Sequence, residues 1–212
     1  MNPMLLAIFP LQLALFPGET VPLHIFEPRY RQLIAECRDE GIHFGIPTAS
    51  QRGLSAYGAE VELVKILKTY DTGEMDIIVR GVRVFHILEV QQEVPGKLYS
   101  GAQVEFPEDD PSFDEETRAK LVEKFTELYR LIGEKQPDIS DAEFGLAFRI
   151  ARDAGLTLGQ RVELLAIRSE RARQEYLLAH IEKAIKAVRE QRGTKNFAGG
   201  NGKPSGNGHA KA

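Results

Sequence analysis

The side chains that most often carry out chemistry are scarce in this sequence of 212 residues. It contains 5 histidines and 1 cysteine, Cys37, and none of them stands at the H-E-x-x-H or paired-cysteine spacing that holds zinc. His24 and His86 lie inside strand patterns, and Cys37 lies on the apolar face of an expected helix. We therefore expect structural histidines and a buried, inert thiol, with no catalytic residue, no metal ligand and no cofactor-binding residue.

Arg29 is a candidate for binding a peptide carboxylate, because a guanidinium group can donate two parallel hydrogen bonds to a carboxylate. Pairing with Glu27 or with the acidic segment 108–116 is the more common use of such an arginine. The segment 202–205, Gly-Lys-Pro-Ser, lacks the full G-x-x-x-x-G-K-[ST] pattern of a phosphate loop. We therefore expect no nucleotide binding at that segment.

The elements that would position these side chains begin with two apolar runs, residues 5–12 and 21–26, which are short enough for strands. Phe16-Pro17-Gly18 lies between them and predicts a turn, because proline presets φ and glycine accepts the left-handed region. Pro28 is well suited to the first position of a helix, where its missing N–H would have no partner in any case. The spacing of the apolar residues predicts that this helix covers 28–39.

Glycine and proline then divide the chain into further strands. The pattern predicts a polar loop at 48–58 and strands over 42–46, 59–70, 75–80, 82–90 and 98–106. About eight short strands with glycine at the corners and one interposed helix favour a small, strongly bent β-barrel over an open parallel sheet.

The second half of the chain has a helical period. Three capping boxes predict helix starts, at Ser112 with Glu115, Ser140 with Glu143, and Thr157 with Gln160. A fourth helix is expected from near Ser169 to Arg192. The fold class is therefore α+β, a small β-barrel with one interposed helix followed by a C-terminal bundle of about four helices.

These elements suggest three regions. Residues 1–107 form a β-barrel subdomain, residues 108–192 form an α-helical subdomain, and residues 193–212 form a tail rich in Gly, Asn and Lys. Because that tail has almost no apolar side chains to bury, we expect it to be disordered.

Two stretches resemble a known family. FPLQLALFPGETVPLHIFEPRYRQLI, residues 9–34, resembles the opening of the N-terminal substrate-recognition domain of Lon-type ATP-dependent proteases, which also occurs as a stand-alone protein. FRIARDAGLTLGQRVELLAIRSERARQEYLLAHIEKAI, residues 148–185, resembles the helical second half of that domain. The resemblance covers about residues 4–188 and implies a β-barrel like that of pseudouridine synthases and archaeosine transglycosylases (PUA-like), followed by helices.

The same resemblance implies a non-catalytic module that recognises unfolded polypeptide segments or a protein partner. A full-length Lon protease adds an ATPase module with a phosphate loop and a protease domain with a Ser-Lys dyad, and this chain stops where those would begin. We therefore expect neither ATP hydrolysis nor proteolysis. Any peptidase activity would belong to the full-length members of the family.

The candidate contacts for a peptide or partner are Phe16 and Pro17, in a turn that we expect to be exposed, together with Arg29 and Tyr30. Phe16, Phe26 and Tyr30 could instead fill the core of the barrel. For Phe26 we expect the core position.

Charge and composition limit the alternatives. Residues 1–107 carry nine Lys and Arg against thirteen Asp and Glu, residues 108–192 carry fifteen against eighteen, and only the tail is basic. Because nucleic-acid binding favours a basic face, an RNA-binding PUA-like module is the less favoured alternative. A small-molecule enzyme in the mouth of the barrel is the other alternative.

The expected location is the cytoplasm. The single cysteine excludes an internal disulfide and fits a reducing compartment. No Lys or Arg precedes Arg29, so the apolar N-terminal run lacks the basic segment of a signal peptide. No stretch is long enough to span a membrane, so we expect no membrane partner.

Overall fold

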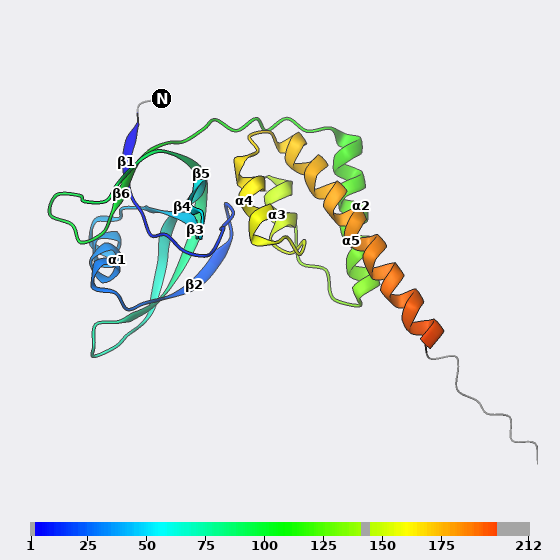
Figure 1. Ribbon diagram of the computed structural model, residues 1–212, viewed down its shortest axis with the longest axis horizontal. Coiled ribbons are helices and arrows are strands. Elements are labelled where there is room, and N and C mark those ends of the chain that lie inside the picture. Colours follow the sequence, from blue (N-terminus) through cyan, green and yellow to red (C-terminus); the bar gives the residue numbers. More distant parts are fainter. Residues whose placement is uncertain (1–2, 141–144, 199–212) are drawn as a thin grey trace, which may run out of the picture.

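One curled antiparallel sheet forms the first half of the computed structural model, which describes residues 3–140 and 145–198 (Figure 1). Its six described strands are β1 (Met4–Ala7), β2 (Thr20–Ile25), β3 (Phe44–Ser50), β4 (Gly53–Thr69), β5 (Met75–Gln91) and β6 (Gly101–Glu105). They are ordered β1-β6-β5-β4-β3, and β2 pairs with the first part of β5.

The sheet closes on itself at the segment that follows β1. Ile8 forms a parallel bridge with Gly45, and Leu11 forms another with Thr48, so the two ends of the strand order meet. The register of β4 against β5 shifts at three places, and such bulges bend and twist long strands. The small, strongly bent barrel predicted from the sequence is therefore confirmed.

Two predictions about how the strands divide were wrong, and six strands are described where about eight were expected. The expected loop at 48–58 is part of the β3–β4 hairpin, because β3 runs to Ser50 and β4 begins at Gly53. The expected strands 75–80 and 82–90 are one strand, β5, which continues through Gly81. A Cβ atom at Gly81 would lie 2.3 Å from the carbonyl oxygen of Phe16, so this glycine permits a close backbone approach rather than a turn.

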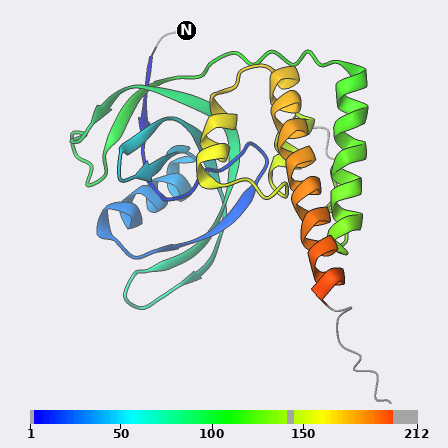
Figure 2. The same cartoon turned by 45° about the vertical axis from the view of Figure 1, so that its right-hand side comes forward.

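Helix α1 (Pro28–Glu40) covers the side of the barrel that faces away from the other helices (Figures 1 and 2). It has proline in its first turn and ends at Gly41, whose φ of 68° is left-handed. Its buried side chains are Tyr30, Leu33, Ile34 and Cys37. They pack with Phe44, Ile77 and Val79 of the sheet in one apolar cluster, so the predicted helix and its inward face are confirmed.

The second half of the chain is helical. It contains α2 (Glu115–Ile132), α3 (Leu146–Ala151), α4 (Leu158–Ala166) and α5 (Glu170–Ala198). Helices α2 and α5 run side by side in the same direction (Figure 2), with ion pairs from Lys120 to Glu182 and from Glu127 to Arg189. In the described part of the chain, no helix is both long and apolar enough to cross a membrane.

The caps of these helices differ in part from the predictions. The capping box of Thr157 and Gln160 is present at α4. Helix α2 is capped by Asp114 instead of Ser112, because a carboxylate oxygen of Asp114 accepts the backbone N–H of Thr117 at 2.8 Å. The backbone N–H of Ser112 is bound to Asp110 instead, which leaves Ser112 outside the helix.

The ends of α3 and α5 also differ. Helix α3 begins at Leu146, six residues beyond Ser140, and Glu143 of the predicted capping box lies outside the described residues. Helix α5 continues past Arg192 to Ala198. The remainder of the expected tail, 199–212, lies outside the described residues.

The helical half shares an apolar core with the barrel. Ala14 and Phe16, from the segment between β1 and β2, belong to the same buried cluster as the inward side chains of α2 to α5. Val84 of β5 packs against that cluster. The contacts between the turn at 16–18 and helices α3 and α4 are called the junction below.

Candidate functional site

The junction is built on the turn Phe16-Pro17-Gly18. The backbone N–H of Glu19 donates to the carbonyl of Phe16 at 3.0 Å, and Gly18 has a φ of 76°, as expected for a type II turn with proline before glycine. Gly18 and Glu19 are hydrogen bonded through their backbones to Gly81 of β5, at 2.8 and 2.9 Å. The sheet therefore holds the turn in place against the helices.

Phe16 is buried, which overturns the prediction that this turn is exposed. Its side chain has an exposed fraction of 0%, and its ring stacks on that of Phe148 in α3 with centroids 5.5 Å apart. The guanidinium carbon of Arg161, in α4, lies 4.1 Å from the centroid of the Phe16 ring. The helices cover the turn, and this coverage depends on residues more than 130 positions away in the sequence.

Arginines of the helical half bind the backbone of the turn. Arg161 Nε donates to the carbonyl of Ala14 at 2.8 Å, and its Nη2 pairs with Glu19. The same carboxylate accepts the backbone N–H of Phe16 at 3.0 Å. Arg152 donates to the carbonyl of Pro17 at 3.1 Å. The junction is therefore held by charged hydrogen bonds as well as by the Phe16 ring.

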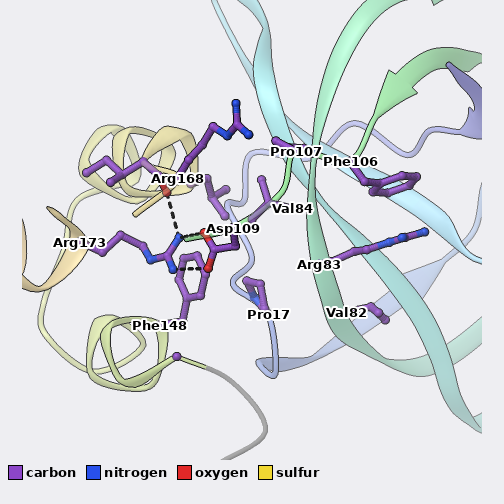
Figure 3. A pocket seen from close by; sticks show the side chains of 13 residues that line it. Pro17, Val82, Arg83, Val84, Phe106, Pro107, Asp109, Phe148, Arg168 and Arg173 are labelled. Atoms are coloured by element: carbon purple, nitrogen blue, oxygen red, sulfur yellow. Dashed lines mark hydrogen bonds and ion pairs between the residues drawn. The ribbon is translucent and has the colours of Figure 1, made fainter. Parts of the chain in front are cut away.

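A cavity of about 230 Å³ opens beside Pro17 between β5 and the helices (Figure 3). Most of its wall is apolar: Pro17, Val82, Val84, Phe106, Pro107, Phe148, Leu165 and Ile167, with Gly145. Its charged lining residues are Arg83, Asp109, Arg168 and Arg173. This combination of an apolar wall with a few convergent charged groups is typical of a binding site.

Arg173 is the most buried charge at the cavity, with an exposed fraction of 2%. It donates to both carboxylate oxygens of Asp109, at 2.7 and 2.5 Å (Figure 3). It also donates to Glu170 at 3.1 Å. Burial opposes its charge, but these two carboxylates outweigh that effect and raise the pKa of Arg173. Its guanidinium also lies over the ring of Phe148, at 4.4 Å from the centroid. Arg173 is therefore fully engaged within the protein.

The other two arginines lie at the exposed edge of the cavity. Arg83 pairs with the buried carboxylate of Glu60 at 2.5 Å, and its guanidinium lies 3.5 Å from the centroid of the Phe106 ring. Arg168 donates to the backbone carbonyl of Glu108 at 3.1 and 3.3 Å. Within the described residues, Arg168 has no carboxylate partner, so its charge remains available to a ligand.

The four predicted contact residues do not form one site. Pro17 lines the cavity, whereas Arg29 and Tyr30 lie in α1, on the other side of the barrel (Figure 1). Arg29 pairs with Glu27 at 2.7 Å, as the sequence favoured. Tyr30 is buried, and its ring stacks on that of Phe9 with centroids 3.7 Å apart.

Phe26 was predicted to fill the core, but its exposed fraction is 59%. The last residue of β2, Ile25, points inward, so the next side chain along the chain points outward. Phe26 therefore adds an exposed aromatic ring just before α1, where it stacks on the ring of His24 with centroids 6.2 Å apart.

The histidines expected to be structural have polar partners. Nδ1 of His24 lies 2.7 Å from Asp76, and Nδ1 of His86 lies 3.0 Å from Glu105. No group of three His, Cys, Asp or Glu among the described residues is placed to hold a metal ion. Burial, and to a smaller extent the carboxylate of Glu36, raises the pKa of the Cys37 thiol to about 12. At neutral pH this thiol is therefore protonated and a poor nucleophile.

The charged groups of the cavity were missed in the sequence. Arg168 and Arg173 lie within the second stretch that resembles the family, where no single arginine was assigned a role, and Asp109 lies within an acidic run. The dense arginines between 149 and 173 were the available signal. The pairing of Arg173 depends on Asp109, which is 64 residues away in the chain.

Residues 6–183 match a model of the ATP-dependent protease La (LON) substrate-binding domain. The chain belongs to this family. The resemblance seen in the two quoted stretches is thereby confirmed, together with the PUA-like α+β fold that it implied. The matched domain is the substrate-binding part of Lon, and it is not itself catalytic.

Solved structures of Lon N-terminal domains have the same fold. A crystal structure of a Lon N-terminal domain protein from Xanthomonas campestris is 28% identical, with a TM-score of 0.65, and the match covers 83% of this chain and 98% of that one. The N-terminal domain of a Lon protease from the Mycobacterium avium complex is 16% identical, with a TM-score of 0.62 and coverage of 84% and 98%. The second likeness concerns the fold alone.

Proposed function

We propose that this Lon substrate-binding-domain protein recognises extended segments of unfolded polypeptide and does not cleave them. The observation that carries the proposal is the family match, which extends through both the barrel and the helices, over residues 6–183. The junction cavity supports it, because apolar walls beside charged groups suit a polypeptide with exposed apolar side chains. A protein partner that presents such a segment would be recognised in the same way.

Two surfaces are candidates for the contact. The first is the junction cavity, to which Pro17 contributes and behind which Phe16 packs. The second is the start of α1, where Arg29 lies over the ring of the buried Tyr30 and the ring of Phe26 is exposed. We favour the cavity, because it is concave and Arg168 carries an available charge, whereas Arg29 is already paired with Glu27.

The test is equilibrium binding to a fluorescent, permanently unfolded polypeptide, measured by anisotropy with ATP absent. We expect saturable binding in the micromolar range. A control polypeptide in which Ser replaces every Leu and Phe should bind at least tenfold more weakly, because the apolar contacts are lost. If the first polypeptide does not bind, the proposal fails, and the search moves to a folded partner that co-purifies from a cell extract.

The absence of catalysis has its own test. The purified protein should hydrolyse neither ATP nor an unfolded protein substrate during a long incubation. Turnover of either substrate that one point substitution abolishes would contradict the non-catalytic role. We also place the protein in the cytoplasm, and cell fractionation tests that location.

A further inference from the structure

We infer that the junction cavity selects a polypeptide segment in which a large apolar residue is followed directly by an acidic one. The cavity takes the apolar side chain, and Arg168 pairs with the neighbouring Asp or Glu. This inference rests on the proposed function and adds to it both the location of the site and the sequence that it prefers.

The size of the cavity limits its occupant. Its volume of about 230 Å³ is below the roughly 300–1,000 Å³ of pockets that hold drug-sized molecules, so it suits one side chain of a longer ligand. Val84 and Phe106 supply apolar wall from the barrel, and Phe148 of α3 supplies it from the helical half (Figure 3). Ile167, which follows α4, also lines the cavity. A Leu or Phe side chain would contact both halves of the protein at once.

The charges around the cavity indicate what should stand beside that side chain. Three guanidinium groups and one carboxylate line it. Arg173 is compensated by Asp109 and Glu170, and Arg83 by the buried Glu60. Arg168 donates to the carbonyl of Glu108 and, within the described residues, pairs with no carboxylate. A ligand carboxylate would complete its hydrogen bonding, whereas a ligand ammonium group would be repelled.

The charges of a second cavity, the hollow beside β1, predict the opposite charge preference for a ligand. A cavity of about 510 Å³ beside β1 is lined by Glu36, Glu40 and Glu60, with Lys97 and His43. Glu36 is paired with Lys97 and Glu60 with Arg83, whereas no ion pair joins Glu40 to another described residue. A ligand bound there would therefore favour a basic residue after the apolar one. The preferred charge of the ligand therefore distinguishes the two cavities.

The experiment uses three fluorescent, unstructured peptides that differ at one position, with Leu-Asp, Leu-Asn or Leu-Lys at the centre. The full chain should bind the Leu-Asp peptide about tenfold more tightly than the Leu-Lys peptide, with Leu-Asn between them, because the aspartate gains a charge pair with Arg168 and the lysine is repelled by it. The preference should weaken as salt is raised, because the charge of Arg168 is exposed.

Two variants locate the site. Arg168→Glu should reverse the order, so that Leu-Lys binds more tightly than Leu-Asp, and this gain cannot come from misfolding. Val84→Trp fills the cavity and should weaken binding of all three peptides at least tenfold, with its folding checked by circular dichroism and urea unfolding. Arg29→Glu makes the same charge change on α1 and should leave the order of the three peptides unchanged.

The outcomes separate this inference from the proposed function. If the parent protein binds unfolded polypeptide but does not distinguish the three peptides, the inference is wrong and the proposed function stands. A preference for Leu-Lys that Arg168→Glu leaves unchanged overturns it in favour of the hollow beside β1. If the parent binds neither the peptides nor the unfolded polypeptide, both proposals fail.

Discussion

The barrel is covered by helices on two sides, and the two covers differ in chemistry. Helix α1 presents four buried side chains, Tyr30, Leu33, Ile34 and Cys37, to an apolar cluster. At the junction, Phe16 is also fully buried, but Arg152 and Arg161 bind backbone carbonyls around it, and a cavity remains beside Pro17.

This difference indicates that the two covers have different roles, the α1 side in stability and the junction in ligand recognition. An apolar cover excludes water and supplies stability in proportion to the surface that it buries. A cover held by arginines keeps polar groups and open space at its edge, where a ligand can compete for hydrogen bonds. We therefore expect substitutions on the α1 side to change stability alone, and substitutions at the edge of the junction to change binding.

The largest expected effect is that of Phe16→Ala at the centre of the junction. Removing a fully buried aromatic side chain that stacks on Phe148 should lower the free energy of unfolding by about 3–5 kcal/mol. Urea unfolding followed by circular dichroism measures it. The matched control is Phe26→Ala, which removes the same side chain from an exposed position and should cost less than about 0.5 kcal/mol. Equal losses in the two variants would contradict the assignment of Phe16 to a shared core.

Next in size is Arg161→Met, which keeps an apolar side chain near the ring of Phe16 but removes the charged hydrogen bonds. The carbonyl of Ala14 and the carboxylate of Glu19 would then lose a partner in a half-buried setting. We expect a loss of about 1–3 kcal/mol in urea unfolding. A loss below about 0.5 kcal/mol would show that the junction is held by its apolar contacts alone.

The burial of Cys37 on the inner face of α1 should make the free energy of unfolding depend on pH in alkaline solution. The folded state raises the pKa of Cys37 from 9.0 to about 12, so above pH 9 the unfolded state loses the thiol proton while the folded state keeps it. Stability should therefore fall as pH rises from 9 towards 12. Unfolding in urea across this range should show a shallower fall for Cys37→Ala than for the parent, because the titrating group is gone. Part of the fall should remain, since burial and the carboxylates of Glu36 and Glu163 raise the pKa of Tyr99 and Tyr176 respectively. Identical slopes for the two proteins would contradict the burial of the thiol.

The smallest expected effect is that of Arg29→Ala at the exposed end of α1. Its pair with Glu27 is exposed, so the free energy of unfolding should change by less than about 1 kcal/mol. Binding of the unfolded polypeptide should also remain within about twofold of the parent if the junction is the site. A large loss of affinity with unchanged stability would move the contact to the start of α1.

The sequence predicted α1 well, because every signal for it lies within a few residues. Proline at the first helical position, apolar residues at helical spacing and glycine after the last turn all agree with the packing that is observed. The capping box at Thr157 is also correct for the same reason. The box predicted at Ser112 was wrong, because Asp114 two residues later competes for the same role and its carboxylate accepts from Thr117.

The exposures of the two phenylalanines could not be predicted from their neighbourhoods. Phe16 follows an apolar run and precedes Pro-Gly, a pattern typical of an exposed turn, yet helices from the far end of the chain cover it. Phe26 ends an apolar run, a pattern typical of a core strand, yet the strand alternation points it outward. A local sequence pattern indicates where a turn or strand lies, but it does not show which distant part of the chain packs against it.

The amino-acid sequence by itself determined the fold class, the family and the positions of most elements, because turn residues, helix caps and apolar periodicity act within a few residues of chain. Only the tertiary structure decided the junction and its cavity. The hydrogen bonds that form the junction join residues 135 and 147 positions apart, from Arg152 to Pro17 and from Arg161 to Ala14. Such contacts depend on how the two halves of the chain meet in space, and no local pattern carries that information.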